Sequence, residues 1–453
     1  MKIEALIKKY NVAIPRYTSY PTVPYWEDIP DNKDWAELVK VSFDKTNKSN
    51  GISIYIHLPY CESICTFCGC NKRITKNHGV EIPYVETVLK EWELYKKIFK
   101  DKPIIKEIHL GGGTPTFFGS ESLKTLINGI MSGSELAKDH EFSIEVHPNV
   151  TNKEQLETLY NLGFRRISLG VQDFDPKVQE IINRIQPYEN VEKVNNIARE
   201  LGFESINFDL VYGLPLQKEE SIIDTINKVK LLRPDRIAFY SYAHVPWKSP
   251  GQRKFTEDDL PSAENKRKLY ELGREMLEKV GYIEIGMDHF ALSSDTLFKS
   301  MAKKTLHRNF MGYTNNYTEL LIGLGVSSIS DTWTGFIQNN KDIDDYMTQV
   351  NSGVIPISVG HKLSQEDTIL RRHILNIMCN FETDWSNEDL QDPALFIGLD
   401  RMKDLEKDGL VEIFSTNLKV TEKGKMFIRN ICMTLDSRLW NKQSSTQIFS
   451  KAI

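Results

Sequence analysis

The sequence lacks several features that would each point to a particular class of protein. No run of apolar residues approaches the ~18 that a membrane-spanning helix needs. The 57 lysines and arginines do not exceed the 62 aspartates and glutamates, so no basic excess is available to neutralise a nucleic-acid backbone. The first residues carry no apolar stretch of the kind found in secretory signals. We therefore expect a cytoplasmic protein without a membrane or nucleic-acid partner.

Cysteine is also scarce, and its distribution along the chain is uneven. The 453 residues include six cysteines, and four of them fall between residues 61 and 70. A disulfide framework would spread its cysteines along the chain, and cytosolic thiols are kept reduced, so this cluster indicates metal binding or redox chemistry. The other two, Cys379 and Cys432, lie in apolar helical segments, where we expect them to be buried as small hydrophobic residues.

The cluster begins Cys61-x3-Cys65-x2-Cys68 and directly follows the first expected strand. Thiolates bind soft metals, so zinc and iron–sulfur clusters are the candidates. A structural zinc usually needs a second ligand pair further along the chain, and no finger-like spacing is present. Three thiolates on a [4Fe–4S] cluster would leave one iron open, as in a catalytic metal site. The three-cysteine cluster is the preferred interpretation, and zinc or a cluster closed by Cys70 are the alternatives.

Short apolar strands alternate with longer helical segments through the first half of the chain. Because strand and helix alternate six times, the pattern predicts a parallel sheet with right-handed crossovers. Six units fall short of the eight of a closed barrel, so we predict an α/β fold with an open, partial (β/α)6 barrel. The expected strands are 52–58, 106–110, 142–146, 166–170, 205–211 and 236–241.

The segments on either side of the barrel have a different composition. The first fifty residues are polar and contain four prolines, so we predict an N-terminal arm over 1–50 with at most short helices. The barrel domain is expected over 51–250. A mainly helical C-terminal domain is expected over 251–453, with a part similar to a winged helix between about 398 and 427.

Several motifs of this sequence together resemble those of a known family. Three cysteines at this spacing, on the first loop of a partial barrel, resemble the radical S-adenosylmethionine (SAM) superfamily. The agreement is closer with the oxygen-independent coproporphyrinogen III oxidases, also called coproporphyrinogen dehydrogenases. The segments that carry it run from about residue 10 to the C-terminus and are PRYTSYPT, YIHLPYCESICTFCGCNK, HLGGGTPTF, LGVQDF, INFDLVYGLP, YAHVP, GMDHFA, LHRNFMGYT and RNICM. The most specific is CTFCGCNK, because heme-chaperone relatives lack its Cys-Gly-Cys continuation.

This resemblance implies a radical SAM oxidoreductase of heme and porphyrin biosynthesis. In the family, Cys61, Cys65 and Cys68 would hold a [4Fe–4S] cluster whose open iron binds SAM. One electron from the cluster then produces a 5′-deoxyadenosyl radical, which attacks two propionates of coproporphyrinogen III. Each loses CO2 and becomes a vinyl group, giving protoporphyrinogen IX. The resemblance also implies a monomer and a low-potential electron donor such as a flavodoxin or ferredoxin.

The family pattern also implies two SAM molecules per chain, one on the cluster and one beside it. Glycines after a strand allow close backbone approach to a ligand, strand-end carboxylates accept hydrogen bonds from ribose, and an arginine can grip a carboxylate. Taken singly, each residue also fits a structural role in a turn, a helix cap or an ion pair. The matching positions are Tyr55, Phe67, Gly112, Gly113, Thr114, Glu145, Gln172, Arg184, Asp209, Ala243 and Ile329.

The substrate-binding residues and the reaction each have more than one candidate. A substrate with four propionates needs cationic partners, and Arg16, Arg253 and Arg308 are candidates. His147 stands where the family more often has an acidic residue, so this loop departs from the family pattern. The alternative functions are a heme-binding or heme-transfer protein and another radical SAM reaction on a tetrapyrrole.

Overall fold

The computed structural model describes residues 3–247, 249–442 and 449. The chain divides into two compact units, each assembled from separate stretches of sequence. Unit 1 comprises Met1–Asp28, Ile283–Tyr317 and Lys362–Ile453, and unit 2 comprises Ile29–Tyr282 and Thr318–His361. Within the described ranges, no helix combines the length and the apolar character that a membrane crossing requires.

Unit 2 is built around six adjacent parallel strands. Each neighbouring pair of these strands runs parallel, which confirms the α/β class, the partial barrel and the strands predicted from the sequence. In spatial order they are β1 (Ile52–Leu58), β4 (Ile104–Gly112), β5 (Glu135–Val146), β6 (Phe164–Gln172), β7 (Ser205–Tyr212) and β8 (Arg236–Ser241). Beyond β1 the sheet continues through β13 (Leu321–Leu324), β14 (Ile329–Asp331), β15 (Gly335–Asn339) and β16 (Ile357–Lys362).

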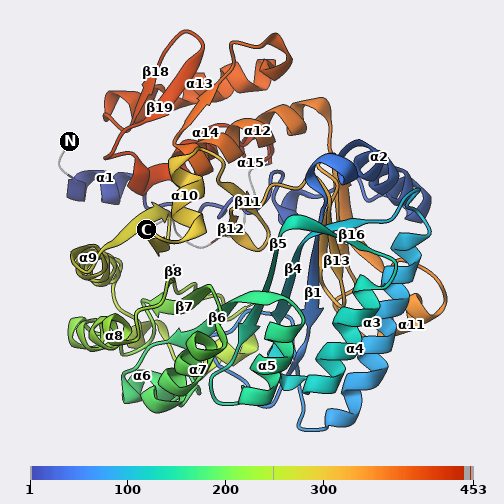
Figure 1. Cartoon of the computed structure of the whole chain (residues 1–453). Coiled ribbons are helices and arrows are strands. Elements are labelled where there is room, and N and C mark those ends of the chain that lie inside the picture. Colours follow the sequence, from blue (N-terminus) through green and yellow to red (C-terminus); the bar gives the residue numbers. More distant parts are fainter. Residues whose placement is uncertain (1–2, 248, 443–448, 450–453) are drawn as a thin grey trace. The chain divides into compact units, whose positions relative to one another are not determined.

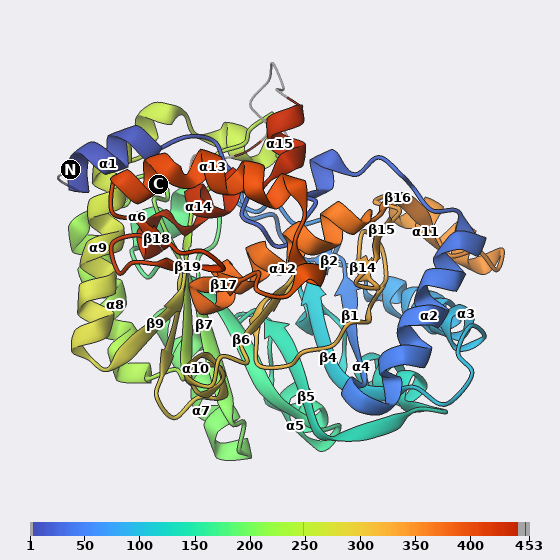
Figure 2. The same cartoon turned by 90° about the horizontal axis from the view of Figure 1, so that it is seen from above.

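The helices that connect the parallel strands lie along the outside of the curved sheet (Figures 1 and 2). They are α3 (Glu81–Lys96), α4 (Ser120–Met131), α5 (Lys153–Asn161), α6 (Pro176–Ile181), α7 (Tyr188–Leu201) and α8 (Glu219–Leu232). Unit 2 also contains α9 (Ala263–Lys279) and α11 (Ile343–Asn351).

The alternation of side chains along each strand separates an apolar face from a polar one. In β1, Ile52, Ile54 and Ile56 are fully buried on one face. Ser53 and Tyr55 lie on the other face because successive side chains of a strand point to opposite sides. Their register partners on β4 are Glu107 and His109, so the polar face continues across the sheet. The strand ends on this face provide the side chains of the candidate site.

The prediction of at most short helices in the first fifty residues is wrong for residues 32–50. This segment forms α2 (Asn32–Asn50), a helix of 19 residues. Asp31 caps its N-terminus by accepting hydrogen bonds from two backbone amides. Trp35, Val39 and Phe43, spaced four residues apart, form its buried stripe. All four prolines of this region precede the helix, so they mark its start and do not interrupt it.

Unit 1 is mainly helical, as expected for the C-terminal part of the chain. Three strands form a small sheet in the order β17-β19-β18; β17 follows α12 in sequence, and β18 and β19 follow α13. The similarity of this part to a winged helix stays a prediction. The helices are α1 (Ile3–Tyr10), α10 (Thr296–Ala302), α12 (Gln365–Asn380), α13 (Pro393–Lys407), α14 (Ile428–Thr434) and α15 (Ser437–Asn441). The strands are β9 (Tyr282–Gly286, which starts at the end of unit 2), β10 (His289–Leu292), β11 (His307–Asn309), β12 (Gly312–Thr314), β17 (Glu382–Asp384), β18 (Val411–Ile413) and β19 (Asn417–Val420).

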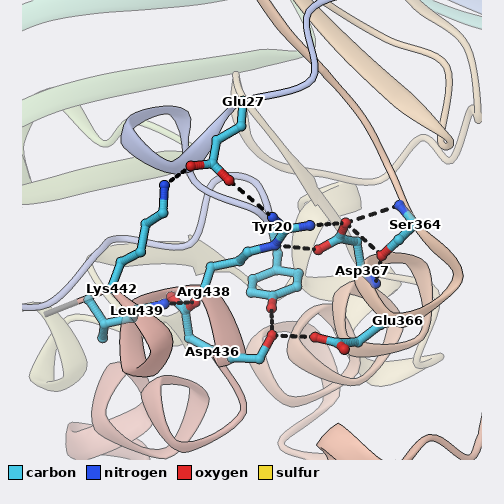
Figure 3. A network of polar contacts seen from close by, with 10 residues as sticks. Tyr20, Glu27, Ser364, Glu366, Asp367, Asp436, Arg438, Leu439 and Lys442 are labelled. Atoms are coloured by element: carbon cyan, nitrogen blue, oxygen red, sulfur yellow. Dashed lines mark hydrogen bonds and ion pairs between the residues drawn. The ribbon is translucent and has the colours of Figure 1, made fainter.

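The N-terminal segment of unit 1 is tied to the C-terminal helices by polar contacts. The hydroxyl of Tyr20 lies 3.0 Å from Ser437 Oγ at the start of α15. Arg438 donates to both carboxylate oxygens of Asp367, the closer at 2.7 Å, and also pairs with Glu27 (Figure 3). Residues near the two ends of the chain therefore share one core.

The divisions between the two units do not coincide with the domain boundaries predicted at residues 50 and 250. Both predicted boundaries fall inside the first stretch of unit 2. The assignment of 1–50, 51–250 and 251–453 to separate functional parts stays a prediction.

Candidate active site

The predicted site residues cluster at the carboxyl ends of the parallel strands in unit 2. In parallel (β/α) folds, this edge of the sheet carries the active site because all the strands end there and lead into loops. Tyr55 lies on β1, Gly112 ends β4, and Glu145 is next to the last residue of β5. Gln172 ends β6, and Asp209 is on β7.

The loop that carries the cysteines starts at the end of β1. Cys61 is buried, and Cys65 and Cys68 are partly exposed. Thr114 Oγ1 donates to Cys61 Sγ at 3.2 Å, which joins the loop after β4 to the first cysteine. Arg184 Nη1 lies 3.6 Å from Cys65 Sγ, in position to donate to it. The structure thus brings two predicted SAM-site residues, Thr114 and Arg184, to the cysteine loop.

The electrostatics of the loop favour the thiolate form of Cys68. Its pKa is lowered to about 6, chiefly by its hydrogen bond with Cys70 and further by the charge of Lys72. The same hydrogen bond raises the pKa of Cys70, so Cys70 is the partner that keeps its proton. Burial raises the pKa of Cys61, which a bound metal would have to deprotonate.

The donor set fits an iron–sulfur cluster with an open position. Nowhere in the described ranges do three His, Cys, Asp or Glu side chains converge to hold one metal ion. In a [4Fe–4S] cluster each cysteine holds its own iron, so the three sulfur atoms need not converge. The backbone at Gly113 packs closely against the cysteine loop. A Cβ at this position would lie 2.6 Å from the Pro59 carbonyl oxygen and 3.0 Å from Cys61 Sγ. Any side chain at this position would crowd the first ligand.

Gly112 adopts a backbone conformation that favours glycine. Its φ is +120°, and a Cβ there would lie 3.0 Å from the His57 imidazole. His57 itself is held between Tyr55 Oη at 3.1 Å and the carbonyl of Asn71 at 2.9 Å. These two contacts fix the orientation of the imidazole at the end of β1.

Glu145 is the most exposed carboxylate of the site. Its side chain is 44% exposed and lies 3.4 Å from both the Gly112 amide and His109 Nε2. His109 Nδ1 is in turn 2.7 Å from Ser143 Oγ. The carboxylate is therefore oriented on one side and open on the other, as a ribose-binding group must be.

Asp209 is a partly buried carboxyl group with two donors. Ser168 Oγ and Asn207 Nδ2 each donate to it at 2.8 Å. Burial, and then the charge of Glu145, raise its pKa to about 6. The charge of Glu145 therefore acts on Asp209, although the two residues lie on strands separated by β6.

Arg184 follows α6 and points back to the strand ends. Its Nη2 donates to the Gly170 carbonyl at 2.6 Å. Its Nε is buried and finds no partner among the described residues. His147 lies near enough that burial and the Arg184 charge lower the pKa of this imidazole to about 3. Arg184 thus keeps a free donor for an anionic ligand, and His147 stays neutral beside it.

A single glutamine joins two of the remaining predicted residues. Gln252 Nε2 donates to the backbone carbonyls of Phe67 at 3.0 Å and Ala243 at 3.3 Å. Gln172 ends β6 with a φ of +68°, which is rare outside glycine and typical of functional sites. Ile329 lies on β14, two strands beyond β1 in the sheet, which makes it the predicted site residue on the far side of β1 from β4.

Comparisons with known proteins agree with this geometry. Residues 55–229 match the family model described as the radical SAM superfamily. The chain is 38% identical to the oxygen-independent coproporphyrinogen III oxidase of Synechocystis, over 99% of this chain and 97% of that protein. It is 38% identical to the Salmonella typhimurium protein of the same name, over 99% of this chain and 98% of the relative. The solved coproporphyrinogen III oxidase of Escherichia coli, titled a radical SAM enzyme, is 36% identical with a TM-score of 0.89, and the match covers 96% and 98% of the two chains.

The chain belongs to the oxygen-independent coproporphyrinogen III oxidase family. Membership in this family confirms the resemblance found in the sequence and the partial radical SAM barrel. It also makes the protein a radical SAM oxidoreductase, with the [4Fe–4S] cluster and SAM that define the superfamily.

Sequence reasoning missed several polar residues that support the oxidase site. His109 contacts Glu145 and is itself held by Ser143, while Ser168 and Asn207 donate to Asp209. A signal was present, because each stands two residues from another polar residue in a strand whose alternate positions are apolar. Gln252 had no such signal, since it lies in a short 3-10 helix (Pro250–Lys254) outside the predicted strands.

Proposed function

We propose that this protein converts two propionates of coproporphyrinogen III to vinyl groups without oxygen, giving protoporphyrinogen IX for heme biosynthesis. The observation that carries the proposal is the similarity to relatives of this name, at 38% identity over 99% of the chain. The site geometry supports it, because the cysteine loop, the glycine turn after β4 and the strand-end carboxylates lie together in unit 2.

In this proposal each part of the site has a separate task. Cys61, Cys65 and Cys68 hold the cluster, which together with SAM supplies a radical able to remove a hydrogen atom. The Gly112–Thr114 turn and the free Nε of Arg184 accept the methionyl end of SAM, because they offer backbone groups and a cation. Glu145 and Asp209 accept hydrogen bonds from ribose hydroxyls. Gln252 links the backbones of Phe67 and Ala243, and these two residues shield the cysteine-loop side of the site from water.

The net change at each propionate is balanced by one hydrogen atom and one electron. Loss of a hydrogen atom from the carbon next to the ring, loss of one electron and release of CO2 convert –CH2–CH2–COO⁻ to –CH=CH2. The hydrogen atom passes to the fragment derived from SAM, and the electron passes to an acceptor outside the chain. Two such events make the product.

We also propose two SAM molecules per chain, which the eleven matching positions support. Tyr55, Gln172 and Ile329 complete that set, and Ile329, on β14, lies on the far side of β1 from β4. A low-potential flavodoxin or ferredoxin as electron donor, a monomeric state and a cytoplasmic location are part of the same proposal. Equilibrium binding of labelled SAM to the reconstituted protein should saturate at two per chain, whereas saturation at one would remove the second site.

The activity is tested with anaerobically reconstituted protein, a chemical reductant, SAM and coproporphyrinogen III. We expect protoporphyrinogen IX and two molecules of CO2 per product. SAM cleavage without CO2 would assign the protein to another radical SAM reaction, and tetrapyrrole binding without SAM cleavage would assign it to heme binding or transfer.

Cys65→Ala provides the matched test of the cluster. Removing one of three thiolates should abolish both the iron–sulfur absorption and product formation, because two thiolates leave two irons of the cluster without a protein ligand. Cys379→Ala is the control, since that thiol is buried in unit 1 and its pKa is raised to about 12 by burial. A full cluster in Cys65→Ala would show that the ligand assignment is wrong.

A further inference from the structure

Arg308 in unit 1 is a buried cation that forms no salt bridge with a carboxylate of the described residues. The residue lies on β11 and is only 6% exposed. Its Nε and Nη1 are buried and, among the described residues, have no hydrogen-bond partner. Its Nη2 makes a single long contact, 3.5 Å, with the backbone carbonyl oxygen of Arg16.

Aromatic rings and thiols pack around Arg308, and the nearby carboxylate of Asp288, whose charge also acts on Tyr313, pairs with Arg16. The guanidinium lies over the Tyr313 ring, 4.5 Å from its centroid, and His289 packs edge-on against the same ring. Cys379 and Cys432 are near enough to feel the Arg308 charge, but burial raises the pKa of each thiol so far that both stay protonated. Neither thiol therefore supplies the missing negative charge.

A second arginine lies beside this position. Arg16 belongs to the PRYTSYPT segment, and its side chain is 31% exposed. It reaches Asp288 at 3.4 Å, which is longer than an optimal charged contact. Arg429 donates to the carbonyl oxygens of Ile14 and Pro15, so the backbone that carries Arg16 is fixed in place.

The arrangement joins three motifs that the barrel site leaves unused. PRYTSYPT, GMDHFA and LHRNFMGYT are far apart in the sequence, yet they provide Arg16, His289, Arg308 and Tyr313 to one place in unit 1. A buried guanidinium with unused donors is unfavourable in the folded protein unless an anion meets it. Its planar fork matches a carboxylate, which accepts two parallel hydrogen bonds.

We propose that Arg308 binds a carboxylate of the tetrapyrrole substrate, with Arg16 at the edge of the same site. The inference rests on the proposed function and adds the residue that recognises a propionate. Arg253, the other arginine considered for this role, is exposed and already donates to the Pro246 carbonyl at 3.1 Å, so its position gives no comparable reason to expect an anion.

The test uses coproporphyrin III, the planar oxidised analogue with the same four propionates, titrated into the whole protein without SAM or reductant. Arg308→Gln should weaken binding at least about tenfold, because a charge-assisted pair is lost. The tetramethyl ester, which has no carboxylate, should bind wild type and Arg308→Gln equally. Arg308→Lys keeps the positive charge but loses the planar fork, so its affinity for coproporphyrin III should lie between those of the wild type and Arg308→Gln.

The controls separate recognition from structure and from the proposed function. Lys403→Gln removes an exposed positive charge of unit 1 and should leave both titrations unchanged. Arg308→Gln should keep its melting temperature and its SAM affinity. Equal weakening of acid and ester, or a loss of SAM binding, would overturn the inference. If Arg308→Gln does not fold, Arg308→Lys must still prefer the acid over the tetramethyl ester less strongly than the wild type does. Failure of the wild-type protein to bind coproporphyrin would instead count against the proposed substrate.

Discussion

At the scale of single residues, burial decides which side chains keep unusual protonation states. Glu91 on α3 is fully buried and accepts hydrogen bonds from Gly325 N at 2.8 Å, Asn339 Nδ2 at 2.6 Å and Tyr346 Oη at 2.6 Å. Burial nevertheless raises its pKa to about 7, because three donors do not fully replace water around a carboxylate. The apolar pattern of the helix predicts its buried face, but only the folded chain brings the three donors together.

Glu91→Gln should therefore change how stability depends on pH. The folded state holds the Glu91 proton up to about pH 7, whereas the unfolded chain releases it near 4.5. Stability gained from this proton is complete below 4.5 and is lost as pH rises toward 7. Glutamine does not titrate, so urea unfolding should show the wild type losing about 3 kcal/mol relative to the variant across that window.

The control for this measurement is Glu93→Gln on the same helix. The Glu93 side chain is 58% exposed and pairs with Lys96 on the same helix. Because an exposed pair of this kind contributes little, Glu93→Gln should change the free energy of unfolding by less than about 0.5 kcal/mol. Parallel pH curves for Glu91→Gln and the wild type would mean that Glu91 is ionised in the folded protein throughout.

At the scale of elements, α2 shows where local patterns were sufficient and where they were overlooked. Asp31 Oδ1 accepts from the amides of Lys33 at 2.9 Å and Asp34 at 2.8 Å, which is the usual N-cap arrangement. Gly51 ends the helix at a φ of +69°, and a Cβ there would lie 2.8 Å from the Ile104 carbonyl oxygen. The N-cap, the apolar stripe and the terminal glycine are all visible in the sequence. The prolines before the helix and its many polar residues nevertheless led to the prediction of at most short helices.

Asp31→Ala should lower the free energy of unfolding by about 1 kcal/mol, because two amides at the start of α2 lose their acceptor. Urea denaturation followed by circular dichroism measures this difference. Glu37→Ala is the control: its side chain is 66% exposed, and its pair with Lys40 at 3.8 Å should contribute little. A loss of similar size in both variants would mean that the effect is not due to the cap.

At the scale of the whole molecule, unit 1 depends on segments from both ends of the chain. Arg438 on α15 pairs with Asp367, whose side chain is completely buried, and with Glu27 from the N-terminal segment (Figure 3). Asp367 also caps α12 through Ser364. One arginine thus connects a helix start, a C-terminal helix and the N-terminal stretch of the same unit.

Arg438→Ala should destabilise the protein by about 2 kcal/mol, because a buried carboxylate loses two charge-assisted hydrogen bonds. The shift in the urea midpoint gives this value. Lys403→Ala, which breaks an exposed pair with Asp400, should change stability by less than about 0.5 kcal/mol. Equal effects in the two variants would show that the Arg438 contact behaves as a surface ion pair.

The sequence by itself determined the six parallel strands, the cysteine loop and the family, because each depends on residues a few positions apart. Strand alternation and the Cys61–Cys68 spacing are local patterns, and the motifs are contiguous. The tertiary structure alone decided the two discontinuous units, the protonation of Glu91 and the burial of Arg308 without a salt bridge. These properties depend on burial and on partners hundreds of residues away, as between Arg16 and Arg308, and no local pattern records which distant segment will supply them.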